Sequence, residues 1–268
     1  MKTIFITGAS AGLGKAAAKL FAAKGWNVIA TMRTPDAAQD LKTVNNITLL
    51  PLDVTRIDQI DDAVKNATAK HKIDVVLNNA GYGLMGPFES TDDSQITRQI
   101  DTNLSGVLRV TKAFTPHLRE NGGGLFVNIT SIGGRAAFPF SAVYHATKWA
   151  LEGFSESLAF ELSQFNIRVK TVAPGGIISD FAERSLDTSS HPAYDNTFGH
   201  MISVARSGKS VFQYSTAEHI AEEVYNAVID DTDRLRYTAG PDATAMYAER
   251  LKIGDEAFRK MIATQLLP

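Results

Sequence analysis

The chain has 268 residues, of which 44% are hydrophobic, and this is enough to fill one large α/β domain or two small ones. Its 27 basic and 29 acidic residues give a formal net charge of −2 without any run of one sign, which argues against nucleic acid or a membrane surface as a partner. There is no cysteine, and the six histidines are scattered. Disulfides, thiolate metal sites and a cysteine nucleophile are therefore excluded, and we predict no metal site.

The N-terminus runs directly into a strand-like segment at residues 3–7. It lacks the charged region, the long apolar stretch and the small-residue cleavage site of a secretory signal, and it does not indicate a membrane anchor. We therefore expect a cytoplasmic protein whose partner is a small molecule.

Short β-rich runs alternate with helical patterns along most of the chain. The expected strands lie at residues 3–7, 28–31, 47–52, 73–78, 125–130, 167–172 and 235–239, and the expected helices at residues 13–24, 35–44, 57–71, 93–120, 142–165 and 217–230. This order predicts an α/β fold with a doubly wound parallel sheet (a Rossmann fold) of about seven strands, with helices on both faces. No linker or repeat divides the chain, so a single domain, residues 1–268, is the simplest interpretation.

Residues 176–214 interrupt the alternation of strands and helices. They form a long, weakly patterned insert that contains several serine, histidine and glycine residues. Such a segment beyond a strand end is a candidate substrate loop or lid. The stretch 242–268 carries no motif that predicts its role.

The first expected strand ends in a glycine-rich turn that leads into the first expected helix. The turn contains Gly8, Ser10, Gly12, Leu13 and Gly14, in the spacing GxxxGxG. Glycines there permit a tight turn and a close approach of backbone N–H groups to a pyrophosphate at the helix N-terminus. Such turns also occur purely for packing, but the first strand-to-helix junction favours dinucleotide binding. The Lys-Ser/Thr ending of a P-loop is absent, which argues against a nucleotide triphosphatase.

Tyr144 and Lys148 are four residues apart in an expected helix, and Ser131 follows the apolar run before it. Side chains at i and i+4 share a helix face, so the ammonium of Lys148 can lie beside the phenol of Tyr144 and lower its pKa from about 10. Tyr144 would then be a usable general acid, and Ser131 would hold a substrate oxygen. Because this spacing also arises by chance on surfaces, the pair indicates catalysis only together with the other motifs.

With the glycine-rich turn, these residues resemble the motifs of the short-chain dehydrogenases/reductases, in the simple single-domain branch of that family. The resemblance covers residues 3 to about 240. In chain order its motifs are the turn at residues 8–14, the segment Asn78, Asn79, Ala80 and Gly81, then Asn103, then Ser131, Tyr144 and Lys148, and finally Pro174 and Gly175.

The resemblance implies that Tyr144 is the general acid in carbonyl reduction and the base in alcohol oxidation. Lys148 would lower the pKa of Tyr144 and bind the nicotinamide ribose, and Ser131 would donate a hydrogen bond to the carbonyl oxygen. Asn103 would hold a water that connects Lys148 to solvent, although an asparagine within a helix also caps or bends it. The hydride itself comes from the cofactor.

The resemblance also implies cofactor contacts at other strand ends. Asp53, with Val54 next to it, would accept a hydrogen bond from the adenine amino group, cap the following helix, or do both. Asn79, Ala80 and Gly81 would face the adenosine side, the alternative being a plain Asn/Gly turn. The contacts around the nicotinamide would be Pro174, Gly175, Ile177, whose backbone N–H would bind the carboxamide, and Ser179, which stands where the family often has threonine.

Arg33 indicates which nicotinamide cofactor is preferred. An enzyme that prefers NAD should carry Asp or Glu after the second strand, whereas here the strand 28–31 is followed by Met32 and Arg33. An arginine suits the 2′-phosphate of NADP(H), and we therefore expect NADP(H) to be preferred over NAD(H) and the working direction to be reduction. The alternative is that Arg33 is only a solvated residue at a strand end.

The substrate is expected to be a ketone or an aldehyde, and an apolar stripe leaves its hydrophobicity open. Such a stripe lines a pocket for a hydrophobic substrate or belongs to the core or an interface. Its residues are Leu84, Met85, Phe88, Phe138, Phe140, Phe181, Tyr194, Phe198 and Met201.

Two other functions are compatible with the same motifs. A sugar-nucleotide epimerase or dehydratase shares the tyrosine, lysine and serine, but it resembles a larger branch with GxxGxxG and a substantial C-terminal substrate domain, both missing here. A catalytically silent NADP(H)-binding regulatory protein commonly loses the tyrosine or the lysine, and both are present. Pairing through the helices at 93–120 and 142–165 would give a homodimer or homotetramer, whereas a monomer would bury the same apolar residues against its sheet.

Overall fold

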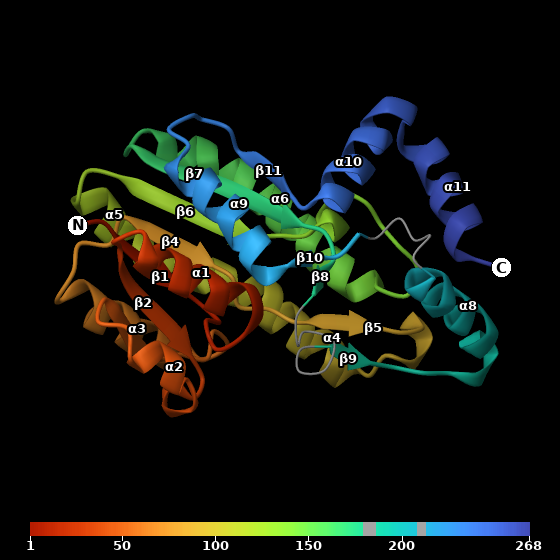
Figure 1. The fold of residues 1–268 in the computed structure, drawn as a ribbon, viewed down its shortest axis with the longest axis horizontal. Helices are drawn as coiled ribbons and strands as arrows, with labels where there is room; N and C mark the ends of the chain where they lie inside the picture. The colour runs from red at the N-terminus through yellow and green to blue at the C-terminus, as the bar shows by residue number, and fades with distance from the viewer. Residues whose placement is uncertain (179–185, 208–212) are drawn as a thin grey trace.

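The computed structural model describes residues 1–178, 186–207 and 213–268 (Figure 1). Seven parallel strands form its central sheet, in the order β11-β7-β6-β4-β1-β2-β3. The strands are β1 (Thr3–Ile6), β2 (Asn27–Met32), β3 (Ile47–Pro51), β4 (Val75–Asn78), β6 (Gly124–Ile129), β7 (Ile167–Pro174) and β11 (Arg236–Ala239). The order reverses between β1 and β4, which confirms the predicted doubly wound sheet and places a ligand-binding crevice at that switch point.

Helices cover both faces of the sheet because alternate strand residues point to opposite sides. Ile4 and Ile6 pack with α1 (Gly12–Ala23) and α9 (Ala217–Ile229) on one face. Phe5, between them, points to the other face, where its ring lies 4.6 Å from that of Phe114. That second face is covered by α3 (Ile57–Thr68), α5 (Gly106–Glu120) and α6 (Ala142–Ser163).

Two expected helices are interrupted in the structure. The expected helix at 35–44 consists of a 3₁₀ turn, Pro35–Ala37, and the short α2 (Gln39–Lys42), because Ala38 between them has a non-helical backbone. The expected helix at 93–120 begins with α4 (Asp93–Ile100) and continues through a π-helical turn, Asp101–Ser105, into α5. Further 3₁₀ turns lie at Phe88–Ser90, Ile132–Gly134 and Pro192–Tyr194.

The insert and the C-terminal stretch form a separate group of elements beyond the carboxyl ends of the strands (Figure 1). Two short strands of the insert pair with strands outside it: β8 (Ile177–Ile178) with β10 (Ser215–Thr216), and β9 (Leu186–Thr188) with β5 (Gly83–Met85). The insert also contains α8 (Asp195–Arg206). The stretch without a motif forms α10 (Pro241–Ile253) and α11 (Asp255–Leu266), which extends the fold past the seventh strand.

A third apolar cluster joins α8, α10 and α11. Phe258, Ile262 and Leu266 of α11 are buried there with Met246 of α10 and Met201 of α8. Met201 of the apolar stripe in the sequence is buried in this cluster, and Met85, Phe138, Phe140 and Phe198 are partly buried and pack against it. Met85 also lines the cavity described below, and Phe181 lies outside the described residues, so the stripe contributes both to packing and to the cavity. In the described part of the chain, no helix has the length and apolar character needed to cross a bilayer.

Replacing Phe258 with alanine should destabilise the protein strongly, because the ring is 2% exposed in the third cluster. We expect Phe258→Ala to lower the free energy of unfolding by about 3–5 kcal/mol, measured by urea denaturation. The matched control is Phe160→Ala on α6, where the ring is 77% exposed and the expected change is within about 0.5 kcal/mol. Equal effects of the two substitutions would contradict the packing of α11.

Candidate active site

A cavity of about 850 Å³ lies at the carboxyl ends of the parallel strands. It brings together nearly all of the residues predicted for the site, from six strand ends and from the helix α6. Those that line it are Gly8, Ser10, Gly12, Leu13, Gly14, Arg33, Asp53, Val54, Asn79, Ala80, Gly81, Ser131, Tyr144, Lys148, Pro174, Gly175 and Ile177. Asn103 is fully buried behind the wall, and Ser179 lies outside the described residues.

The glycine-rich turn approaches the β4 end so closely that side chains are excluded. Gly8 and Gly12 have positive φ, at 70° and 51°. A Cβ on Gly14 would overlap the carbonyl oxygen of Gly8 and the amide nitrogen of Asn79. The helix α1 starts at Gly12 after Ala11, whose side chain cannot cap it, so the first N–H groups of the helix are left for an anion in the cavity.

Two asparagines fasten the end of β4 to its neighbours. Asn79 donates from Nδ2 to the carbonyl oxygens of Thr7 and Gly8, at 3.0 and 3.1 Å. Asn78 donates from Nδ2 to Thr111 Oγ1 and to Asn128 Oδ1, at 3.0 and 2.9 Å. The segment is therefore more than a plain turn, because its side chains join β1, β4, β6 and α5.

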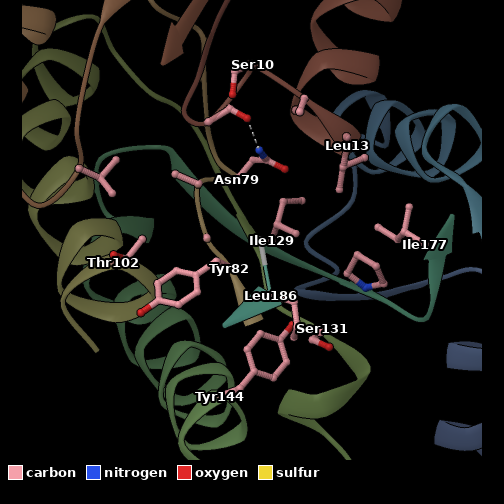
Figure 2. A pocket seen from close by; sticks show the side chains of 18 of the residues that line it. Ser10, Leu13, Asn79, Tyr82, Thr102, Ile129, Ser131, Tyr144, Ile177 and Leu186 are labelled. Carbon is pink, nitrogen blue, oxygen red and sulfur yellow. Dashed lines mark hydrogen bonds between the residues drawn. The ribbon is translucent and has the colours of Figure 1, made fainter. Parts of the chain in front are cut away.

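Ser131, Tyr144 and Lys148 meet at one end of the cavity. Figure 2 shows the serine and tyrosine side chains pointing toward one another. Ser131 Oγ also accepts from the Gly133 N–H at 3.0 Å. Lys148 Nζ lies 5.7 Å from the centre of the Tyr144 ring and donates to the carbonyl oxygen of Ile129 at 2.9 Å. The i, i+4 spacing thus places the ammonium beside the phenol, as expected.

Burial governs the titration of this pair. Desolvation raises the pKa of Tyr144 above its usual value near 10, and the Ser131 hydroxyl opposes the rise. Desolvation also lowers the pKa of Lys148 to about 8, against an opposing effect of the Glu152 carboxylate. In the protein alone, loss of water therefore sets the direction of the Tyr144 shift, and the lowering by Lys148 stays a prediction.

Asn103 lies in the π-helical turn, and its side chain bonds to the backbone of Tyr82. Its Oδ1 accepts from the Tyr82 N–H at 3.0 Å, and its Nδ2 donates to the Tyr82 carbonyl oxygen at 2.8 Å. A Cβ on Gly81 would lie 3.1 Å from Asn103 Oδ1 and 3.8 Å from Lys148 Nζ. The two side chains therefore converge on Gly81, which keeps the space between them open. A π turn often marks a functional site, and here it turns Asn103 inward.

Asp53 and Arg33 lie near the opposite end of the cavity. Asp53 Oδ1 accepts from the N–H and the hydroxyl of Thr55, at 3.0 and 2.8 Å. It is not the N-cap of α3, since Arg56 holds that position. Arg33 is exposed and forms no salt bridge with any residue that the structure describes.

A buried carboxylate connects the elements that carry the candidate catalytic residues. Glu152, one turn after Lys148 on α6, accepts from Thr130 Oγ1 at 2.6 Å and pairs with Arg135 at 3.3 Å and Arg236 at 3.1 Å. Glu152 and Arg135 are each 5% exposed. Thr130 and Arg135 flank Ser131, so this network fixes the serine loop relative to α6.

Several lining residues were missed from the sequence, namely Tyr82, Arg98, Thr102, Leu186, Asp187 and Tyr214. Tyr82 follows Gly81 directly, and Thr102 precedes Asn103, so adjacency to a motif was the available signal. Arg98 forms an ion pair with Asp187, which also accepts from Gln95 Nε2 at 2.9 Å. These bonds hold β9 of the insert against α4 beside the cavity.

Comparisons with known proteins agree with this geometry. The family model for short chain dehydrogenases matches residues 2–189. The chain belongs to the short-chain dehydrogenase family. It is 37% identical over 269 residues to the oxidoreductase BOA17 of Botryotinia fuckeliana, covering 97% of both chains. This dehydrogenase is therefore an oxidoreductase.

Two solved structures resemble this dehydrogenase over most of its length. A short-chain dehydrogenase from Streptomyces avermitilis superposes with a TM-score of 0.86 at 32% identity, covering 98% of this chain and 95% of that one. The structure of ElxO with NADP bound superposes with a TM-score of 0.76 at 25% identity, covering 91% of this chain and 99% of that one.

His145, next to Tyr144, makes the stability of this dehydrogenase sensitive to acid. Burial lowers the pKa of His145 to about 4, so the ring is neutral in the folded protein at pH 7. The pKa of a histidine in the unfolded chain is about 6.5. The contribution of the neutral His145 ring to the free energy of unfolding is therefore complete above pH 6.5 and is lost as the pH falls toward 4. We expect the free energy of unfolding to fall by about 3 kcal/mol more in the wild type than in His145→Asn between pH 7 and pH 4, measured by urea denaturation.

The matched control for this effect is His200→Asn, at an exposed histidine of α8. Its acid dependence should follow that of the wild type. If His145→Asn also followed the wild type, the neutral state of His145 would be contradicted.

Proposed function

We propose that this protein is an NADP(H)-dependent carbonyl reductase that converts a ketone or aldehyde to an alcohol, with Tyr144 as the general acid. The observation that carries the proposal is that the Ser131 and Tyr144 side chains point toward one another, with Lys148 beside them in the same cavity as the dinucleotide turn. An acid and a carbonyl-binding hydroxyl thus lie together within reach of a bound nicotinamide.

The residues of the cavity fit a dinucleotide. The uncapped N-terminus of α1 and the space kept open by Gly8 and Gly14 suit a pyrophosphate. Asp53 has an acceptor oxygen at the far end, and Arg33 is available for a 2′-phosphate. When bound, the reduced nicotinamide supplies the hydride, and the protein supplies position and the proton.

Ser131 can donate a hydrogen bond into the cavity. Because the Gly133 N–H donates to Ser131 Oγ, one lone pair of the serine is occupied and its hydroxyl proton is free for the carbonyl oxygen of a substrate. A hydrogen bond from this hydroxyl polarises the carbonyl and stabilises the negative charge that develops on its oxygen during reduction.

Tyr144 then donates its hydroxyl proton to the same oxygen. In the protein alone the raised pKa keeps Tyr144 protonated, which is the form required of an acid in reduction. Lys148, whose pKa of about 8 leaves it mostly charged at pH 7, stabilises the phenolate formed after transfer. Lys148 and Asn103 converge on Gly81, and this supports a route by which a proton returns to Tyr144.

Removing the phenol hydroxyl should separate chemistry from binding. We expect Tyr144→Phe to lower kcat by about 10²–10⁴ while the Kd for NADPH, measured by fluorescence titration, stays within about twofold. Near-normal turnover in this variant would contradict the role of Tyr144. A wild type that binds NADPH but reduces no member of a broad ketone and aldehyde panel would favour the silent regulatory protein instead.

Arg33 should determine the choice of cofactor. A charge-assisted hydrogen bond contributes roughly 1.5–3 kcal/mol, so we expect Arg33→Ala to lower kcat/KM for NADPH by about 10- to 100-fold and to leave that for NADH nearly unchanged. The matched control is Arg56→Ala, at an exposed arginine after β3 that pairs with Asp58 at 2.9 Å. A wild type that prefers NADH would rule out this role.

A further inference from the structure

Asp242 is a buried carboxylate that the proposed chemistry does not use. It lies in the first turn of α10, in the stretch that carries no motif, and is 2% exposed. Its Oδ2 accepts from the Gly176 N–H at 2.8 Å, and its Oδ1 accepts from the Ala243 N–H at 2.8 Å. The backbone of Gln213 favours the charged form of the same carboxylate. One side chain thus joins the first residues of the insert to the C-terminal helix.

The carboxylate also packs tightly against the turn after β7. A Cβ on Gly175 would overlap Asp242 Oδ1, so the two groups are in contact only because residue 175 is glycine. Gly240, which has a φ of 92°, allows the chain to enter α10 with the carboxylate in this position. The turn is further tied by the Gly175 N–H, which donates to the Ala239 carbonyl oxygen, and by the Ser215 N–H, which donates to that of Gly176, at 3.0 and 2.9 Å.

Backbone N–H groups are the hydrogen-bond donors to Asp242. Among the described residues no lysine or arginine forms an ion pair with it, and the N–H groups of Gly176 and Ala243 donate to its two oxygens. Burial raises the pKa of Asp242, while these amides oppose the rise. An asparagine of the same shape would place an NH₂ group against one of the donors, which leaves an N–H unpaired. A carboxylate is therefore matched to this position.

The turn held in this way forms a wall of the cavity. Pro174, Gly175, Gly176 and Ile177 all line it, together with Ser131 and Tyr144. We propose that Asp242 is a positioning residue that holds this turn in place and thereby sets the nicotinamide end of the bound cofactor against Tyr144. This inference rests on the proposed function for its kinetic consequence, but the immobilisation of the turn does not depend on that function.

The effect of Asp242→Asn should be confined to the nicotinamide half of the cofactor site. We expect its Kd for NADPH to rise about tenfold and kcat to fall about tenfold, which corresponds to one lost buried hydrogen bond. The Kd for adenosine 2′,5′-bisphosphate, which occupies only the adenosine half, should stay within about twofold of the wild type. The control is Asp255→Asn in α11, at an exposed carboxylate that pairs with Arg250 at 3.0 Å and is remote from the cavity lining.

Hydrogen exchange in the cofactor-free protein tests the immobilisation directly. Peptides that contain Gly176 and Gln213 should exchange faster in Asp242→Asn, whereas peptides from β1 and β4 should be unchanged. If Asp242→Asn fails to fold, Gly175→Ala is the second variant, because its Cβ would separate the turn from the Asp242 carboxylate. It should raise the Kd for NADPH more than the Kd for adenosine 2′,5′-bisphosphate. Unchanged exchange in Asp242→Asn, or equal weakening of both ligands in the variant that folds, overturns the inference.

The two hypotheses fail in different ways. If the wild type reduces no carbonyl but the exchange at Gly176 and Gln213 depends on Asp242, the proposed function fails and the positioning of the turn stands. If the wild type is an active reductase and Asp242→Asn binds NADPH and turns over as the wild type does, the positioning role fails and the proposed function stands.

Discussion

The geometry of the candidate active site depends on the buried hydrogen bonds and ion pairs of Glu152. Its carboxylate is buried and accepts hydrogen bonds from the residues before and beyond Ser131, while its own helix carries Tyr144 and Lys148. Breaking a buried pair of this kind typically costs about 3–5 kcal/mol, because a charge is left without compensation. The serine and the tyrosine therefore reach one another from different elements without either having to be ordered by a ligand.

The same arrangement separates binding from chemistry. The dinucleotide end of the cavity is built from backbone groups, the first N–H groups of α1 and the glycines that leave space for a ligand. The other end is built from side chains held by buried charges. Desolvation there raises the pKa of Tyr144 and lowers that of Lys148, which favours the neutral form of each. For the proposed reductase, such a site is preorganised, because Ser131 and Tyr144 face one another before a substrate binds.

The sequence was sufficient to predict the order of the sheet and most of the lining, because those depend on local patterns and on motifs next to strand ends. It was insufficient where partners are distant. Asp242 meets Gly176 from 66 residues away, and no spacing relates them. Apolar periodicity does not distinguish a pocket from a core, so it could not predict that Phe140 and Phe198 pack against the cluster around α11. The rise in the pKa of Tyr144 in the protein alone could not be predicted, because the extent of burial is a property of the fold.

The π-helical turn at Asp101–Ser105 constrains how the chain can change in length. A π turn holds one more residue than an α-helical turn, so deleting a residue there would restore a regular helix and rotate every following position by about 100°. Asn103 would then leave Tyr82, while Thr111 and Phe114 of α5 would turn away from the sheet. Substitutions at exposed positions of this helix are compatible with the fold, but an insertion or deletion between α4 and α5 would disturb the site and the core together.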